Sequence, residues 1–258
     1  MKIVIKIGTS TLAHASGRLN IRKTEELCKI ISDLKNDGQE IILVSSGAIG
    51  MGCGKLGFKK RPADMETKQA AAAVGQCDLM YTYDRLFSQY NHTVAQVLIT
   101  ASDVNHEERH KNFTSTLNRL LELDVIPIIN ENDTIATDEI GIGDNDTLAA
   151  IVATSAKADL LILLSDIDGL FTSDPRKDPN ASLISEVRDL DEHILVLGGD
   201  SGTELGTGGM KTKLSAAKIC LDAGCDMIIT NGAEPDNLYK ITDGIPVGTR
   251  FFARRANK

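Results

Sequence analysis

Short runs of Ile, Val and Leu recur along the chain, separated by longer stretches in which apolar residues return every three or four positions. The short runs predict buried β-strands, and the longer stretches predict amphipathic helices. The predicted strands cover residues 2–7, 40–45, 93–99, 125–130, 159–165 and 226–230. The predicted helices cover residues 21–35, 65–90, 103–123, 144–156 and 210–223, the first with Asn20 as its N-cap.

This alternation of strand and helix predicts an α/β fold with a mainly parallel central sheet and helices on both faces. Pro127 lies inside the 125–130 run, although a proline in a sheet belongs at an edge, a start or a bulge. Small residues in the segment 66–77 allow close helix packing, in the core or at a subunit contact, and we favour the core. No low-complexity linker interrupts the chain, so we expect one domain over residues 1–258.

Composition narrows the class of protein. The chain has 258 residues, of which 42% are hydrophobic and 25% charged, as is ordinary for a globular protein. A net charge of -8 argues against a nucleic-acid partner, and no apolar run approaches the roughly 20 residues that a membrane helix needs. The start of the chain lacks the apolar stretch of a signal peptide, and its five cysteines form no Cys-x-x-Cys pair. We expect a reduced, cytoplasmic enzyme or binding protein without a disulfide framework or tetrathiolate zinc site.

Glycines cluster where predicted strands end or helices begin. Strand 2–7 runs into Gly8-Thr9-Ser10, strand 40–45 runs into Ser46-Gly47, and Gly206-Thr207-Gly208-Gly209 precedes helix 210–223. Glycine lets backbone N–H groups approach a ligand, and a helix N-terminus attracts anions. A single such cluster is ordinarily a turn, but three of them, two with a lysine nearby, predict an anion site, with phosphate as the natural anion. Neither a Walker loop nor a dinucleotide fingerprint is present.

A dense polar cluster occupies the middle of the chain, in the segments 130–133, 138–139 and 143–146, and Ser165-Asp166 ends the next strand. Turns and helix caps explain single Asp and Asn residues, but not so many around two short turns. Such a cluster can orient an ammonium group, hold a metal-bound nucleotide or position lysines.

A competing motif predicts a zinc hydrolase. His106-Glu107-Glu108-Arg109-His110 fits the His-Glu-x-x-His pattern, in which both imidazoles lie on one helix face. The flanking residues are polar, and a third imidazole is available only far off in a loop-rich stretch, so we favour a solvated helix face.

Five segments, taken together and in order, resemble the amino acid kinase family over essentially the whole chain. They are Lys6-Ile7-Gly8-Thr9-Ser10, Ser45-Ser46-Gly47-Ala48-Ile49, Ile129-Asn130-Glu131-Asn132-Asp133, Gly143-Asp144-Asn145-Asp146 and Gly206-Thr207-Gly208-Gly209-Met210-Lys211-Thr212-Lys213. Relatives that act on acetylglutamate or aspartate usually carry Gly-Gly after the first lysine, whereas this chain has Gly8-Thr9. The segments are most similar to those of the members that phosphorylate the side-chain carboxylate of L-glutamate, the first step of proline biosynthesis.

The resemblance implies a three-layer α/β/α sandwich that binds ATP, with Mg²⁺ on its phosphates, and L-glutamate at the carboxyl ends of the strands. It assigns phosphoryl-group contacts to Lys6 and Lys213, the placing of these lysines to Asp146, and glutamate binding to Ser46, Asp133 and Asn145. It assigns nucleotide binding to Lys6, Gly8, Ser165, Asp166, Thr207, Gly208, Gly209, Met210, Lys211, Thr212 and Lys213, and no metal-ligating side chain. A glutamate carboxylate, with a pKa of about 4.3, is already ionised and needs no general base, which agrees with the lack of histidine in these segments.

Other expectations follow from the same resemblance. Many bacterial members continue into a small PUA domain, whereas this chain stops at Lys258, so we expect the kinase domain without that module. The expected partners are L-glutamate, ATP, further copies of the chain and the next enzyme of the proline pathway. The alternatives are a non-catalytic sensor of the same fold and a kinase for another small acid such as N-acetylglutamate.

Overall fold

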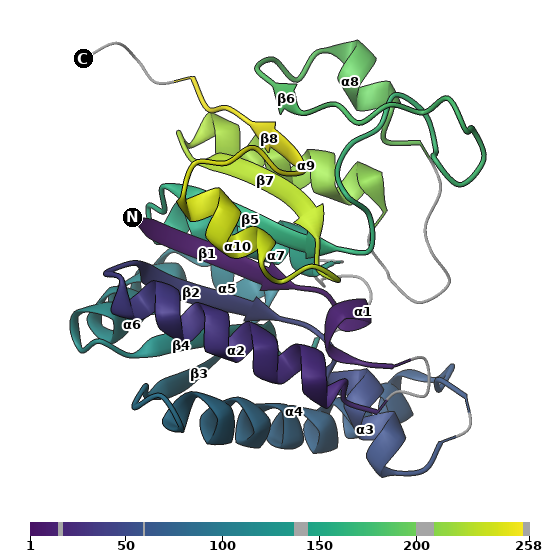
Figure 1. Ribbon diagram of the computed structural model, residues 1–258. Helices are drawn as coiled ribbons and strands as arrows, with labels where there is room; N and C mark the ends of the chain where they lie inside the picture. Colours follow the sequence, from purple (N-terminus) through teal and green to yellow (C-terminus); the bar gives the residue numbers. More distant parts are fainter. Residues whose placement is uncertain (15–17, 59, 137–143, 200–208, 255–258) are drawn as a thin grey trace.

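The computed structural model describes residues 1–14, 18–58, 60–136, 144–199 and 209–254. Its strands form one eight-stranded sheet in the order β3-β4-β2-β1-β5-β7-β8-β6 (Figure 1). The strands are β1 (Lys2–Ile7), β2 (Glu40–Ser45), β3 (Val94–Ile99), β4 (Ile126–Glu131), β5 (Leu160–Ser165), β6 (Glu186–Val187), β7 (Asp226–Asn231) and β8 (Thr249–Phe251). The predicted strands are thus confirmed to within about a residue, and β6 and β8 are additional.

Almost every pair of neighbouring strands is parallel. The register runs from Lys2 opposite Glu40 to Ile7 opposite Ser45 between β1 and β2, and β5 lies on the other side of β1 in the same direction. Only β7 and β8 pair in the antiparallel sense within the described residues. The carboxyl ends of β1, β2, β4, β5 and β7 therefore meet at one edge of the sheet, the edge at which open α/β sheets bind ligands.

The helices connect the strands. They are α1 (Thr9–Leu12), α2 (Ile21–Asn36), α3 (Ala48–Lys55), α4 (Met65–Ser88), α5 (Ala101–Asn105), α6 (Glu107–Glu122), α7 (Asn145–Ser155), α8 (Glu192–Val196), α9 (Met210–Asp222) and α10 (Asn237–Thr242). Asn20 caps α2 as predicted, because its side chain accepts a hydrogen bond from the Lys23 N–H. Within the described residues, no helix is both long enough and apolar enough to cross a membrane.

One helix prediction was wrong. The segment 103–123 is not a single helix, because the backbone of His106 is extended and separates α5 from α6. Thr100 and Asp103 form a capping box at the start of α5, and His106 then acts as the N-cap of α6. Local capping therefore outweighs the helical periodicity of the segment.

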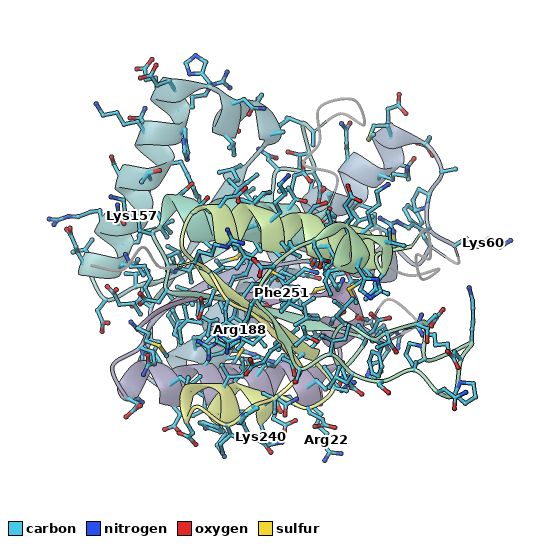
Figure 2. The ribbon with its side chains drawn as sticks, turned by 90° about the horizontal axis from the view of Figure 1, so that it is seen from above. Arg22, Lys60, Lys157, Arg188, Lys240 and Phe251 are labelled. Carbon is cyan, nitrogen blue, oxygen red and sulfur yellow. The ribbon has the colours of Figure 1, made fainter. Side chains whose placement is uncertain are left out.

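Two hydrophobic cores lie on opposite faces of the sheet and give the three-layer sandwich that the family resemblance implied. Successive residues of a strand point to opposite faces, so Val4 packs with residues of α6, α7 and α9, while Ile5 packs with residues of α2, α4 and α10. Figures 1 and 2 show these helix layers with the sheet between them. In the view of Figure 2, Lys60 and Lys157 lie at the periphery, whereas Phe251 is fully buried.

Pro127 is compatible with the sheet because of where β4 pairs. It is the second residue of β4, and the register between β4 and β2 begins only at Ile128 opposite Leu43. The proline therefore lies at the start of the strand, before the ladder with β2 begins, as the absence of its N–H requires.

Helices α3 and α4 are in backbone contact through glycine. A Cβ on Gly52 of α3 would lie 1.8 Å from the carbonyl oxygen of Ala71, and a Cβ on Gly75 of α4 would lie 1.8 Å from that of Ala48. Gly47 precedes α3 with φ +100, a conformation that favours glycine. The small residues of the segment 66–77 thus pack within the chain, and this contact fixes the position of α3 directly after β2.

This contact predicts a difference between two glycines of one helix. Gly52→Ala should lower the free energy of unfolding by about 1–3 kcal/mol or more, because its methyl group forces α3 away from α4. Gly50→Ala is the matched control, since its Cβ would meet only the Thr9 Cγ2 atom, at 3.8 Å. Urea denaturation should leave the control within about 1 kcal/mol of the parent. Equal effects of the two substitutions would contradict the packing argument.

Candidate active site

Lys6 is placed at the carboxyl edge by the alternation of β1. It lies on the same face of the strand as Val4, the face that α7 and α9 cover. Gly8 follows directly, and a Cβ there would lie 3.7 Å from the Lys6 Nζ atom. The absence of a side chain at Gly8 therefore leaves space beside this ammonium group.

Asp146 is held in the first turn of α7. Asp144 is the N-cap of this helix, and its side chain accepts hydrogen bonds from the N–H groups of Asp146, at 2.6 Å, and Thr147, at 2.9 Å. Asp144 itself is buried, and burial is the largest influence raising the pKa of its carboxyl group. The cap fixes the start of α7 and with it the direction of the Asp146 side chain.

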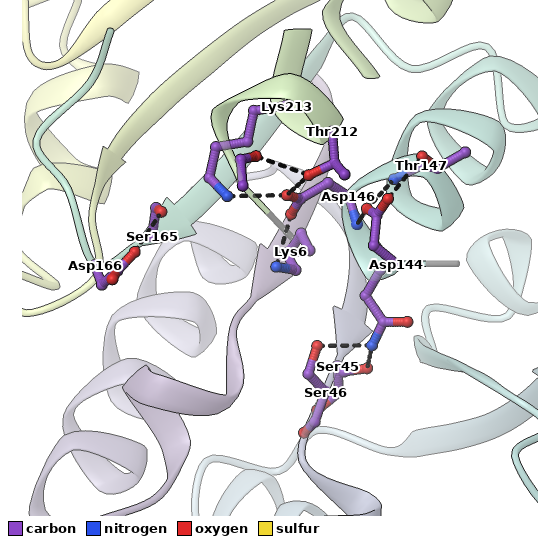
Figure 3. A network of polar contacts seen from close by, with 12 residues as sticks. Lys6, Ser45, Ser46, Asp144, Asp146, Thr147, Ser165, Asp166, Thr212 and Lys213 are labelled. Carbon is purple, nitrogen blue, oxygen red and sulfur yellow. Dashed lines mark hydrogen bonds and ion pairs between the residues drawn. The ribbon is translucent and has the colours of Figure 1, made fainter. Parts of the chain in front are cut away.

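Lys213 completes a bridge between three elements. It lies in α9, whose buried Ala216 and Ala217 belong to the same core as Ala149 and Ala150 of α7. Its Nζ atom is 3.0 Å from Asp146 Oδ2, and the Lys6 Nζ atom is 2.7 Å from Oδ1 (Figure 3).

Thr212 adds a hydroxyl group to this bridge. Its Oγ1 atom lies 2.8 Å from the Gly209 carbonyl oxygen and 3.3 Å from Asp146 Oδ2, so its single hydrogen can be donated to either acceptor. The three predicted catalytic residues are thus brought together although they are far apart in sequence.

The electrostatics of the bridge favour an ionised carboxylate. Burial, the largest influence, raises the pKa of Asp146, but the two ammonium groups outweigh it and lower this pKa to about 2. The Asp146 side chain is 1% exposed, and those of Lys6 and Lys213 are 12% and 8% exposed. The cluster carries two positive charges and one negative charge away from bulk water, so it can stabilise an added anion.

A second cluster forms beside the first, around Asn145. The Nδ2 atom of Asn145 donates to the Ser45 carbonyl at 2.9 Å, to Ser46 Oγ at 2.6 Å and to Asn130 Oδ1 at 3.3 Å. Asn145 and Asp146 are consecutive residues, so the start of α7 serves both clusters. The structure thus brings together two of the three predicted glutamate-binding residues.

Asp133, the third of these residues, lies just beyond β4 and is partly buried. Burial and the nearby Glu131 carboxylate raise the pKa of Asp133 to about 6, while Arg61 acts in the opposite direction. A carboxylate that is poorly solvated and near another negative charge favours binding of a cation.

The residues predicted to bind the nucleotide line one pocket in part. The pocket is lined by Asp166, Ile167, Leu170, Phe171, Ser173, Asp174, Pro175, Arg176, Leu197, Gly209, Met210 and Lys213. Ser165 donates to Asp166 at 3.3 Å, and Asp166 pairs with Arg176 at 3.0 Å. The Lys211 side chain is exposed and does not line the pocket, and Thr207 and Gly208 lie outside the described residues.

Sequence reasoning missed two residues of the second cluster. Asn130 is 2% exposed and accepts from Asn145, although only its motif and not its role was recognised. Gln76 of α4 accepts from Asn130 Nδ2 at 2.9 Å. The available signal was a glutamine on the core-facing side of an otherwise small and apolar helix segment.

The zinc-hydrolase motif does not form its expected geometry. His106 is the N-cap of α6 and lies outside the helix, with Nδ1 accepting from the Arg109 N–H at 3.5 Å. His110 instead hydrogen-bonds Ser155 at 2.8 Å. Among the residues that the structure describes, no three His, Cys, Asp or Glu side chains are grouped closely enough to hold a metal ion.

Comparisons with known proteins agree with this geometry. The sequence model of the amino acid kinase family matches residues 1–231. The glutamate 5-kinase of Clostridium tetani (strain Massachusetts / E88) is 51% identical over 251 residues, covering 97% of this chain and 94% of that protein. The glutamate 5-kinase of Clostridium perfringens (strain 13 / Type A) is 48% identical over 258 residues, covering 98% and 96%.

A solved structure shows the same fold at low sequence identity. Carbamate kinase from Giardia lamblia bound to AMP-PNP superposes with a TM-score of 0.68 at 17% identity, covering 98% of each chain.

The bridge predicts that replacing Asp146 with a neutral residue strongly destabilises the protein. Asp146→Asn leaves two buried ammonium groups facing each other and should lower the free energy of unfolding by about 3–5 kcal/mol, measured by urea denaturation. Adding Lys213→Met to this variant removes one unpaired charge and should recover part of the loss. A single variant as stable as the parent, or a double variant less stable than the single one, would show that the three charges do not interact as described.

Proposed function

The chain belongs to the amino acid kinase family, and within it we propose that the chain is a glutamate 5-kinase, which transfers the γ-phosphoryl group of ATP to the side-chain carboxylate of L-glutamate. The single observation that carries this proposal is the bridge from Lys6 through Asp146 to Lys213 at the carboxyl edge of the sheet. The near-full-length similarity to glutamate 5-kinases supports the choice of substrate.

The two lysines meet the main requirement of the reaction. The acceptor carboxylate is ionised at neutral pH, so no base is needed, but two anions must approach each other in line. Lys6 and Lys213 neutralise the transferring phosphoryl group, and Asp146 holds both ammonium groups in place before the substrates arrive. Charge stabilisation that is already in position needs little reorganisation during the reaction.

The glutamate subsite follows from the second cluster. Ser46 and Asn145 bind the substrate beside the lysines, and Asp133 pairs with its α-ammonium group. The raised pKa of Asp133 supports this role, because the ammonium group adds positive charge that stabilises the ionised form of this half-buried carboxylate. N-acetylglutamate has no ammonium group and is therefore expected to be a poor substrate.

The nucleotide occupies the pocket between the β5 end and the start of α9. Asp166, Gly209 and Met210 line this pocket and contact the nucleotide. Ser165, which hydrogen-bonds Asp166, is a further contact, and Gly8 leaves space for the phosphates beside Lys6. Lys211 and Thr212 stay predicted contacts of the nucleotide, and Thr207 and Gly208, also predicted, lie outside the described residues.

A divalent metal, Mg²⁺, enters with the nucleotide. We propose that this ion would be held mainly by the phosphate oxygens of the nucleotide and by water. When bound, Mg²⁺ neutralises phosphate charge.

The proposed domain organisation, cellular compartment and protein partners rest on expectations from the sequence. We propose a single kinase domain over the whole chain, supported by two cores packed on one sheet. Five free cysteines support a reducing compartment, the cytoplasm. Self-association and contact with the next enzyme of the proline pathway stay predictions.

The reaction itself can be trapped. With ATP, Mg²⁺, L-glutamate and hydroxylamine, the enzyme should form γ-glutamyl hydroxamate, because an acyl phosphate is a strong electrophile. Lys6→Ala and Lys213→Ala should each lower kcat by about 10²–10³, since each removes a positioned charged donor. N-acetylglutamate serves as the control acceptor and should react far more slowly. ADP release that depends on glutamate without hydroxamate would contradict a carboxylate kinase.

The pKa of Asp133 predicts a pH dependence for glutamate use. Only the ionised form pairs with the ammonium group, so kcat/KM for glutamate should fall as the pH drops below about 6, while kcat/KM for ATP changes less. Asp133→Asn should lower kcat/KM for glutamate above about pH 6 and abolish this dependence, because Asp133 of the parent is itself neutral at lower pH.

The stability of Asp133→Asn distinguishes a loss of glutamate binding from misfolding of the variant. Because the pKa in the folded state is raised, ionising Asp133 destabilises the fold as the pH rises through about 6. Asp133→Asn should therefore be at least as stable as the parent at neutral pH. If kcat/KM of Asp133→Asn for glutamate still falls below about pH 6, a group other than Asp133 causes that fall.

A further inference from the structure

Helix α4 directs polar side chains at the sheet edge that holds the second cluster. Gln76 and Tyr83 are seven residues apart, about two helical turns, and so lie on the same side of α4. Gln76 hydrogen-bonds Asn130 at the end of β4, and the Tyr83 hydroxyl lies 3.0 Å from the Ser45 Oγ atom at the end of β2. Gln76 is 8% exposed and Tyr83 is 1% exposed, so both contacts are inside the protein.

Main-chain groups fix the orientation of the carboxamides between α4 and α7. Asn130 Oδ1 accepts from the backbone N–H of Glu131 at 2.9 Å, and a backbone N–H can only donate. The Nδ2 atom of Asn130 is therefore the one that points to Gln76, where it donates to Oε1 at 2.9 Å. Because Oε1 of Gln76 faces Asn130, the other terminal atom of the Gln76 side chain must be Nε2, a donor. Asn145 is oriented in the same way at the other end, since its Nδ2 atom donates to the Ser45 carbonyl, which can only accept.

This donor has no acceptor among the residues that the structure describes. The Nε2 atom of Gln76 is buried and lacks a hydrogen-bond partner among the described residues. A buried N–H without an acceptor is destabilising, and methionine would fill the same space on α4 without that penalty. The unsatisfied donor therefore points to an acceptor that the described part of the chain does not supply.

We propose that Gln76 Nε2 donates a hydrogen bond to the α-carboxylate of the glutamate substrate and makes the site specific for it. This inference rests on the proposed function. The side-chain carboxylate must lie at Lys6 and Lys213, next to Asp146 and Asn145. Gln76 lies at the far end of this polar chain, beyond Asn130, so it meets the opposite end of the substrate.

The chemistry of an amide suits this position. The α-carbon of glutamate carries an ammonium group, which Asp133 pairs with, and a carboxylate, which needs a donor. A lysine here would add a third positive charge and compete with Lys6 and Lys213 for the phosphates. A neutral N–H donor recognises the carboxylate without that competition.

The test compares two substrates in two variants. 4-Aminobutyrate lacks the α-carboxylate altogether and keeps the ammonium group and the reacting carboxylate. Gln76→Met should raise KM for L-glutamate by about 10- to 100-fold, change kcat little and leave KM for 4-aminobutyrate nearly unchanged. The preference of the enzyme for glutamate over 4-aminobutyrate should shrink by the same factor. Gln69→Met is the matched control, because Gln69 lies one heptad earlier and donates to the Ala136 carbonyl instead.

Three results would overturn the proposal: an unchanged KM for glutamate, an equal rise in KM for both substrates, or an equal effect of Gln69→Met. The second would show that Gln76 acts only through Asn130 and Asn145. Failure of the parent enzyme to form hydroxamate from glutamate would instead refute the proposed function, so the two failures are distinguishable.

A second variant covers the case in which Gln76→Met does not fold. The protonated carboxyl group of Gln76→Glu can accept from Asn130 and donate to the substrate, whereas the ionised group can only accept. KM for glutamate should therefore rise with pH more steeply in Gln76→Glu than in the parent, with KM for ATP as the internal reference. A profile parallel to that of the parent would overturn the proposal.

Discussion

One carboxylate determines where the parts of this site lie. Asp146 is 1% exposed and forms ion pairs with two lysines that come from a central strand and from a helix late in the chain. A buried charge is tolerated only when it is paired, so β1, α7 and α9 must meet at this point for the fold to be stable. Structural and functional demands therefore coincide at Asp146, because the contact that satisfies its charge also aligns two ammonium groups at the sheet edge.

The two halves of the site are connected through the first turn of α7. Asp144 caps the helix, Asn145 reaches the end of β2, and Asp146 reaches the lysines. Neighbouring residues of one helix turn point in different directions, so a single capped turn serves both the phosphoryl side and the amino acid side. The distance between the acceptor and the transferring group is thus set by covalent geometry and by one helix cap, which suits a reaction that depends on in-line positioning.

The sequence alone predicted the strands well because the central strands are buried on both faces and read as unbroken apolar runs. It did not predict β6 and β8, which have two and three residues and depend on pairing with distant segments. The break at His106 was missed because a capping interaction replaced helical periodicity. The lysines and Asp146 were identified through family motifs, since no local spacing connects residues so far apart. Gln76 was missed because its role depends on a hydrogen bond to the end of β4, which is distant in the sequence.

The shared start of α7 has a consequence for how this enzyme can change. The helix is anchored along its length by alanines that are fully buried against α9 and the sheet. A rigid-body displacement of α7 moves Asn145 and Asp146 together, so it changes acceptor affinity and turnover at the same time. Changes in substrate preference must instead come from elements that touch only one half, such as α4 and the segment after β4. Adaptation of the acceptor specificity is therefore expected in these elements and not through movements of α7.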